Sequence, residues 1–183
     1  MPVDERELIA GCRSGDEAAM RMLFGQHQQA VYAMALRLTG EKADAQDVVQ
    51  ETFLKAFRHI RGFRGDASVR TWLVRIAINL CRDLHRKRSR IQAGTDAAGE
   101  PVEPERVGAR DEPADAFARK RLQAALSRLP EGYREVLVMH DVMDMGHGEI
   151  AAVLGVAEGT SKSQLHKARA RMREMLVARG AES

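Results

Sequence analysis

Apolar residues recur at helical spacing along most of the chain. Residues 28–38 show the pattern plainly, because apolar side chains fall at i, i+3, i+4 and i+7 starting from Val31 and therefore share one helix face. The same spacing predicts helices over residues 43–60 and 69–86, and Ser-Gly-Asp at residues 14–16 predicts a break between two earlier helices. The N-terminal half is therefore predicted to be a helical bundle.

The C-terminal part predicts further helices that end in a helix-turn-helix. One amphipathic helix stops at Pro130, and a second spans residues 133–140. A helix over residues 149–154, a turn at Gly155 and a long helix with Thr160 as its N-cap then give the helix-turn-helix pattern. The long helix is predicted to bury an apolar stripe formed by Leu165, Ala168, Met172 and Leu176. The residues predicted to face outward from it are Ser163, His166, Lys167 and Ala170.

Residues 94–115 differ from both flanks in composition. They contain three of the five prolines and seven acidic residues against two basic ones, with little to bury. Both flanks carry more basic than acidic residues, 16 against 11 in residues 1–93 and 11 against 8 in residues 116–183. We therefore predict an all-α protein with two small helical domains, residues 1–93 and 116–183, joined by a flexible acidic linker over residues 94–115.

The overall composition is typical of a soluble helical protein. Hydrophobic residues make up 44% of the chain, charged residues 30% and aromatic residues only 4%. The sequence contains neither a long apolar run nor a basic-then-apolar leader, so no membrane insertion is expected. Cys12 and Cys81 match no metal-binding or redox spacing, which fits a reducing cytoplasm and leaves their roles open.

The chain offers no pattern that is typical of catalysis. Its histidines lack a nucleophile or carboxylate at a recognisable spacing, and no glycine-rich phosphate loop follows a strand, so neither an enzyme nor a cofactor is expected. The segment MHDVMDMGH at residues 139–147 contains thioether and imidazole groups that suit copper(I). Methionines at such spacing are more typical of core packing, and we predict no metal site.

Residues 160–179 hold six basic side chains against Glu174 alone. Such a density of positive charge is typical of a surface that binds a polyanion. A solvated helix face gives the same pattern, however, so charge alone leaves both interpretations open.

Three segments in this order resemble bacterial sigma factors of the extracytoplasmic function (ECF) group of the sigma-70 family. They are DAQDVVQETFLKAF at residues 44–57, FRGDASVRTWLVRIAINLCRDLHRKRSR at residues 63–90, and the motifs LSRLPEGYREV and GEIAAVLGVAEGTSK within residues 126–176. The resemblance implies a protein that binds core RNA polymerase, recognises two elements of promoter DNA and helps to melt it, without catalysis of its own. It also implies an anti-sigma protein as a partner.

One polar, acidic stripe is predicted on the helix over residues 43–60. An acidic stripe favours a basic partner, and similar positions in the family dock on the coiled coil of the largest polymerase subunit. The residues that the resemblance assigns to this contact are Asp47, Gln50, Glu51 and Leu54.

Residues 63–90 combine aromatic, amide and cationic side chains, the groups that bind single-stranded DNA. By resemblance they capture the non-template strand of the −10 element, with Asn79 lining the pocket for an extruded base. Trp72 fits either core packing or base stacking, and Val69 stands where the family often has an aromatic residue. The residues assigned to the −10 element are Phe63, Arg64, Arg70, Trp72, Arg75, Asn79, Arg82, Arg86 and Lys87.

By resemblance, the second helix of the helix-turn-helix recognises the double-stranded −35 element. Lysine suits guanine acceptors or phosphates, whereas the arginines further along hold phosphates and fix the register. Ser161 and Gln164 depart from the family's usual residues, so base preference does not transfer. The residues assigned to the −35 element are Thr160, Lys162, Ser163, His166, Lys167, Arg169 and Arg171.

Two alternatives stay open at the level of sequence. In related sigma factors the connector between the domains passes through the RNA exit path of the polymerase. The acidic linker either imitates RNA there or serves only as a tether. The alternative function is a helix-turn-helix regulator that acts without polymerase and binds an operator as a dimer. Specific DNA binding by the free protein would favour that alternative.

Overall fold

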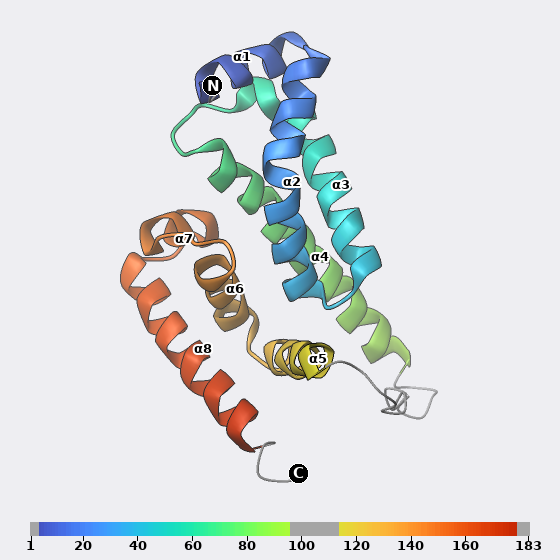
Figure 1. The fold of residues 1–183 in the computed structure, drawn as a ribbon, viewed down its shortest axis with the longest axis vertical. Coiled ribbons are helices and arrows are strands. Elements are labelled where there is room, and N and C mark those ends of the chain that lie inside the picture. The colour runs from blue at the N-terminus through green and yellow to red at the C-terminus, as the bar shows by residue number, and fades with distance from the viewer. Residues whose placement is uncertain (1–3, 96–113, 179–183) are drawn as a thin grey trace.

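The computed structural model describes residues 4–95 and 114–178, and every regular element in these ranges is helical (Figure 1). The predicted all-α fold is therefore confirmed. The N-terminal elements are α1 (Glu5–Ser14), α2 (Glu17–Thr39), α3 (Lys42–His59), the 3₁₀ turn η1 (Ile60–Gly62) and α4 (Val69–Thr95). The C-terminal elements are α5 (Ala114–Ser127), α6 (Glu131–Asp141), α7 (His147–Leu154) and α8 (Glu158–Ala178).

Local capping sets the ends of the first two helices. Gly15 closes α1 with φ 84°, a left-handed conformation that glycine adopts without strain. The side chain of Asp16 then accepts a 2.8 Å hydrogen bond from the backbone N–H of Ala18 and begins α2. The predicted break at residues 14–16 is thus confirmed. Gly40, with φ 79°, ends α2, and Gly25 inside this helix does not interrupt it.

One hydrophobic cluster holds the N-terminal helices together. It joins α1, α2, α3, η1 and the start of α4, and the ring of Phe24 packs edge-on against Phe53 at 4.8 Å between centroids. Its buried members are Leu8, Ile9, Cys12, Ala19, Leu23, Phe53, Ala56, Ile60, Phe63, Val69 and Leu73.

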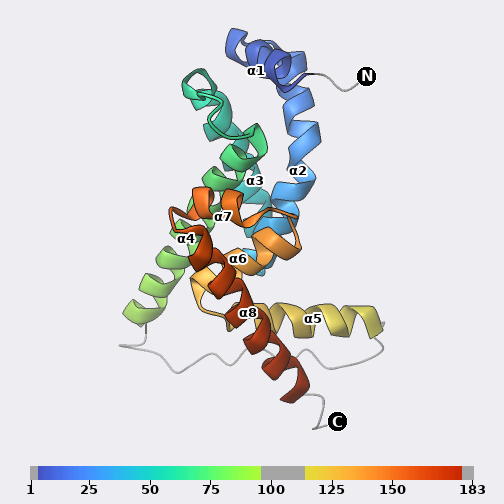
Figure 2. The same cartoon turned by 90° about the vertical axis from the view of Figure 1, so that its left-hand side faces the viewer.

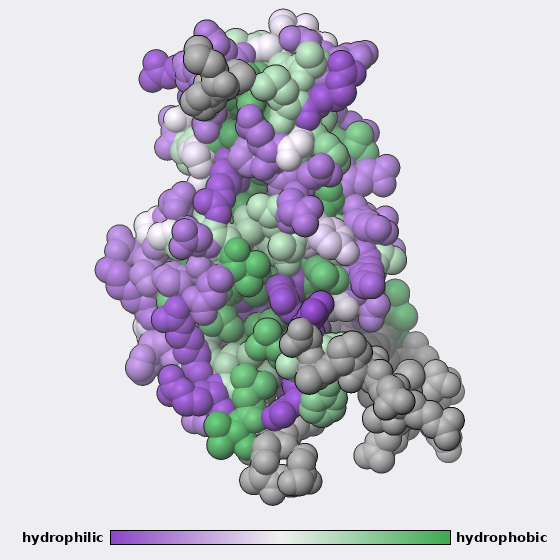
Figure 3. Space-filling model, in the orientation of Figure 1, coloured by the Kyte–Doolittle hydropathy of each residue, from purple (hydrophilic) through white to green (hydrophobic). Residues whose placement is uncertain are grey.

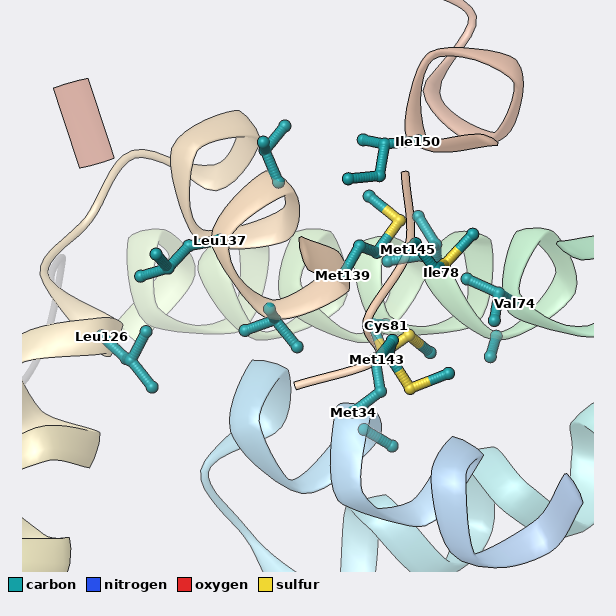
Figure 4. Packing of buried hydrophobic residues seen from close by; sticks show 14 of the residues in the cluster. Met34, Val74, Ile78, Cys81, Leu126, Leu137, Met139, Met143, Met145 and Ile150 are labelled. Carbon is teal, nitrogen blue, oxygen red and sulfur yellow. The ribbon is translucent and has the colours of Figure 1, made fainter. Parts of the chain in front are cut away.

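A second cluster joins the two halves of the chain. It combines buried side chains of α2, α3 and α4 with those of α5 to α8 and the loop before α7, and Figure 4 shows Met139, Met143 and Met145 beside Ile78 and Cys81. In Figures 1 and 2, α6 and α7 lie between α8 and the N-terminal helices. The two helical modules, here defined as α1–α4 and α5–α8, therefore pack on each other instead of standing apart. Most of the predicted linker, residues 94–115, lies outside the described residues.

The helix-turn-helix consists of α7, a turn at Gly155 with φ 70°, and α8. Leu165, Ala168 and Met172 are buried, as the predicted stripe requires, and Leu176 packs against the same cluster. The prediction of Thr160 as the N-cap is wrong, because α8 already begins at Glu158 and the backbone N–H of Thr160 donates to the carbonyl of Ala157. Glu158 in the first turn complements the helix dipole and favours this earlier start.

The methionines of residues 139–147 are core residues. Met139, Met143 and Met145 are all buried in the second cluster, which agrees with packing. Among the described residues, no three His, Cys, Asp or Glu side chains gather as a metal site would require. None of the helices in these ranges has the length and apolar character needed to cross a bilayer.

Candidate functional site

The acidic stripe of α3 lies on the surface of the molecule. Asp47, Gln50 and Leu54 are exposed, and Glu51 is half-buried with one carboxylate oxygen 4.0 Å from the Nζ of Lys55. The opposite face of α3 anchors the helix through buried Phe53. The four residues assigned to polymerase docking thus share one accessible face, and three of them are polar.

A shallow groove between α2 and α3 continues this stripe. It encloses about 330 Å³ and is lined by Phe24, Gln28, Gln29, Tyr32, Gln46, Val49 and Gln50. Sequence reasoning missed the α2 residues of this groove. Their exposed polar and aromatic side chains carry no motif, and only the packing of α2 beside α3 brings them to the stripe.

The loop before α4 is fixed in place by α1. The guanidinium of Arg13 donates to the carbonyl of Phe63 and, over 3.4 Å, to that of Ile60. Glu5 accepts a 3.1 Å hydrogen bond from the backbone N–H of Val69 at the start of α4. Sequence reasoning missed both α1 residues, because their partners lie about 50 to 64 positions further along the chain.

A cavity of about 230 Å³ opens between this loop, the first turn of α4 and α7. Trp72 lines the cavity and also packs on Phe63, with 5.0 Å between the ring centroids, so the tryptophan takes part in both core and cavity. Arg64 and Arg75 line it as well. Asn79 is exposed further along α4 and does not line this cavity.

The cationic side chains of α4 do not all face solvent. The guanidinium of Arg82 donates through Nε and Nη2 to the two carboxylate oxygens of Glu135 on α6, at 2.6 and 2.7 Å. This hydrogen bond raises the pKa of Arg82, against the opposing effect of partial burial. Arg75 donates a 2.9 Å hydrogen bond to the carbonyl of Ala152 on α7. Arg86 pairs with Asp83 on its own helix, and Lys87 is exposed.

The face of α8 opposite its buried stripe is open. Ser163, His166 and Lys167 are exposed, as predicted from the helical spacing. Figure 3 shows hydrophilic side chains covering much of the lower left-hand edge of the molecule, where Figure 1 places α8. Ser161 is instead fully buried and hydrogen-bonds His147 at 2.9 Å, so it connects α8 to α7 and is not available to DNA.

Three of the α8 cations already have partners within the module. Lys162 pairs with Glu158 at 2.7 Å, and the guanidinium of Arg171 lies 5.2 Å from the ring centroid of Tyr133. Arg169 bonds Asp141 at the end of α6. Burial raises the pKa of Asp141, but hydrogen bonds from Arg169 and His140 outweigh burial and hold the pKa below its usual range.

Two family models match the chain in the order of its two modules. The model for sigma-70 region 2 matches residues 23–91, and that for sigma-70 region 4 matches residues 119–172. The ECF RNA polymerase sigma factor SigM of Mycobacterium tuberculosis is 36% identical over 172 residues, which cover 94% of this chain and 84% of that protein.

Solved structures show the same arrangement of helices. The chain is similar to CnrH in complex with the cytosolic domain of CnrY, with a TM-score of 0.74 and 29% identity over 95% of this chain and 97% of that one. It is also similar to RpoE of Bartonella quintana in complex with the anti-sigma factor NepR, with a TM-score of 0.65 and 28% identity over 81% and 91% of the two chains. The two helical modules, their order and these relatives together establish that the chain belongs to the ECF sigma factors of the sigma-70 family.

Proposed function

We propose that this sigma factor docks on core RNA polymerase through the acidic stripe of α3, defined by Asp47, Gln50, Glu51 and Leu54. Exposed carboxylates speed association with a basic partner and fix its register, while Leu54, 42% exposed, supplies apolar area at the centre. The groove between α2 and α3 extends the same surface. Polymerase, in this proposal, meets the chain on the side where α2 and α3 lie together.

The loop over residues 62–67 and the outer face of α4 are proposed to bind the non-template strand of the −10 element. The cavity beside Trp72 has a volume on the scale of one nucleobase, and Arg64 and Arg75 at its rim can hold the strand's phosphates. Val69 is buried and offers no stacking surface, so Trp72 and Phe63 are the aromatic groups available to a base there.

The outer face of α8 is proposed to enter the major groove of the −35 element. Ser163, His166 and Lys167 can reach base edges or phosphates, while Arg169 and Arg171 lie further along the same helix. Thr160 stands in the first turn of α8 and Lys162 begins the second, so both lie near the helix end whose dipole favours a phosphate.

The observation that carries the proposal is the opposite charge of one exposed face on each of two neighbouring helices of the N-terminal module. The exposed stripe of α3 is acidic, while α4 carries a row of cations beside aromatic rings, so one module has a face for a basic protein and a face for DNA. The chain supplies binding surfaces and no catalytic group, and it acts in the cytoplasm with the polymerase. Because the related RpoE is bound by an anti-sigma factor, we also propose an anti-sigma partner here.

The docking surface is tested by reversing one charge. Glu51→Lys is expected to abolish co-purification with core polymerase while leaving the helical circular dichroism unchanged, because a cation there would repel the basic partner. Glu17→Lys reverses an exposed acidic residue on α2, outside the stripe, and serves as the matched control. Unchanged association of Glu51→Lys would refute the docking assignment.

The alternative of a regulator that acts alone is tested with the wild-type chain. The proposal expects a run-off transcript only when core polymerase is present, and no sequence-specific complex between promoter DNA and the free protein. A specific complex of a dimer with DNA, together with the absence of a polymerase-dependent transcript, would establish the alternative.

A further inference from the structure

A pocket of about 400 Å³ lies between the two modules and shares no lining residue with the cavity beside Trp72. The N-terminal module contributes the last turn of α2, the first turn of α3 and the second half of α4. The C-terminal module contributes α5 and the first turn of α6. The volume falls in the range of roughly 300 to 1,000 Å³ that is typical of sites for small molecules.

Arg134 of α6 brings a buried positive charge to this pocket. The residue is 7% exposed, and Nη1 of its guanidinium donates to the carbonyl of Ser127 over 3.5 Å, a long distance for such a bond. Within residues 4–95 and 114–178, no carboxylate pairs with the guanidinium, and its Nε and Nη2 donate to no acceptor. An arginine has five N–H donors and stays charged inside a protein, so most donors of Arg134 are unused.

The carboxylates near Arg134 already have other partners. Both carboxylate oxygens of Glu135 accept hydrogen bonds from Arg82. Asp44, the acidic residue that lines the pocket, forms an ion pair with Arg88. Because a buried charge without a partner costs folding free energy, the free donors of Arg134 favour an anion that the described residues do not supply.

The remaining lining fits a phosphate group. Arg88 and Arg134 against Asp44 leave the lining with a net positive charge. His85 and Ser89 on α4 add further polar groups around the same space. A guanidinium binds phosphate through parallel hydrogen bonds, and the other phosphate oxygens remain free to accept from such neighbours.

We propose that this pocket binds a small phosphorylated molecule, with the phosphate on Arg134 and the organic part along Leu38 and Leu84. These two leucines give the pocket an apolar wall, and the volume exceeds what a phosphate alone would fill. The site needs neither DNA nor polymerase and is separate from the proposed function. Because both modules form the lining, the ligand would link their packing to its own concentration.

Binding is measured by isothermal titration calorimetry of the full-length chain at constant ionic strength. The probes are ribose 5-phosphate, inorganic phosphate and, as the neutral control, ribose. We expect ribose 5-phosphate to bind more tightly than inorganic phosphate, ribose not to bind, and the midpoint of thermal unfolding to rise with the concentration of the ligand. Equal affinities for the two phosphates would overturn the organic ligand, and absence of binding would mean that only water fills the pocket.

Arg134→Met tests the guanidinium, because methionine keeps a long side chain without the charge. This variant is expected to weaken binding of ribose 5-phosphate by about tenfold or more, the effect of losing hydrogen bonds to a charged group. Arg128→Met is the matched control, since Arg128 is exposed directly after α5 and does not line the pocket. Equal weakening in both variants would show adsorption to general positive charge and overturn the site.

Ser127→Asp tests the pocket with Arg134 in place, and decides the matter if Arg134→Met does not fold. The carbonyl of Ser127 already contacts the guanidinium, so an aspartate there supplies the missing negative charge and excludes the phosphate. Binding should fall by about tenfold or more. Ser14→Asp is the matched control, because both serines end a helix, are exposed and donate to the carbonyl three residues earlier.

Undiminished binding in Ser127→Asp would overturn the proposal, as would the same loss in Ser14→Asp. The proposed function is judged separately by polymerase-dependent transcription, which requires no phosphorylated ligand. A normal transcript together with absence of ligand binding would refute the pocket alone.

Discussion

The α4 face and the α8 face are both cationic, yet their cations have different partners. Arg75 and Arg82 of α4 bind groups of the other module, whereas Lys167 of α8 is exposed. Two cations of the helix proposed for the melted strand therefore bind the other module, although Lys87 of that helix is exposed, whereas the paired cations of α8 bind groups of their own module.

The largest expected effect concerns the ion pair between the modules. Arg82→Ala should lower the free energy of unfolding by about 3 kcal/mol, because Glu135 would remain enclosed as an unpaired carboxylate. Urea unfolding at pH 7, followed by helical circular dichroism, measures the change. A loss of unfolding free energy below about 1 kcal/mol would make this pair equivalent to a surface pair. The cations of α4 would then not differ in this respect from those of α8.

A lysine of α8 should affect DNA binding and not stability. Lys167→Ala is expected to weaken binding of the polymerase holoenzyme to a −35 duplex by about 1 kcal/mol and to reduce the slope of log affinity against log salt by about one. Arg21→Ala on α2 removes a comparable exposed cation outside the proposed interfaces. An unchanged salt slope would place Lys167 away from the phosphates.

The pair between Asp141 and Arg169 is expected to give a smaller, pH-dependent effect. Because the folded-state pKa of Asp141 is depressed, its contribution to stability is present above the unfolded pKa of about 4 and is lost as the pH falls through the folded value. Side chains that are 37% and 49% exposed limit this contribution to under about 1 kcal/mol. Unfolding of the wild type and Asp141→Asn at pH 5 and pH 3 checks it, and parallel losses in both proteins would contradict it.

The smallest effect is expected for the exposed pair of α8. Lys162→Ala removes the partner of Glu158, and both side chains are more than half exposed, so the free energy of unfolding should not change measurably. The same urea measurement applies. A loss comparable to that of Arg82→Ala would mean that the first turn of α8 depends on this pair.

Local signals predicted the helices and the helix-turn-helix. Glycines at positions 15 and 155 stand in left-handed conformations where the sequence predicted turns, and the apolar spacing of α8 separated its buried face from its open face. The start of α8 was misplaced, because a threonine followed by polar residues resembles a cap even where the preceding residues are already helical.

The packing of the two modules could not be predicted in the same way. The contact depends on pairs such as Arg82 with Glu135, which are 53 residues apart, and neither residue is marked by a local pattern. The hydrophobic spacing of α4 predicts that one face of this helix is buried. The spacing does not indicate which helices cover that face, and Ile78 and Cys81 prove to pack against the other module. The sequence identified the groups proposed for the −10 strand without revealing that Arg75 and Arg82 among them bind the other module.

The hydrogen bonds from Arg13 to the loop before α4 have an evolutionary consequence. The side chain of Arg13 in α1 binds carbonyl groups at Ile60 and Phe63, next to the proposed base cavity. The cavity itself is lined by residues of the loop, α4 and α7, and not by Arg13. Substitution of Arg13 would release these carbonyl groups and let the loop shift, while every residue proposed to contact DNA stays the same. Paralogues could thus acquire separate sets of target genes by drift at a distance from the nucleic acid.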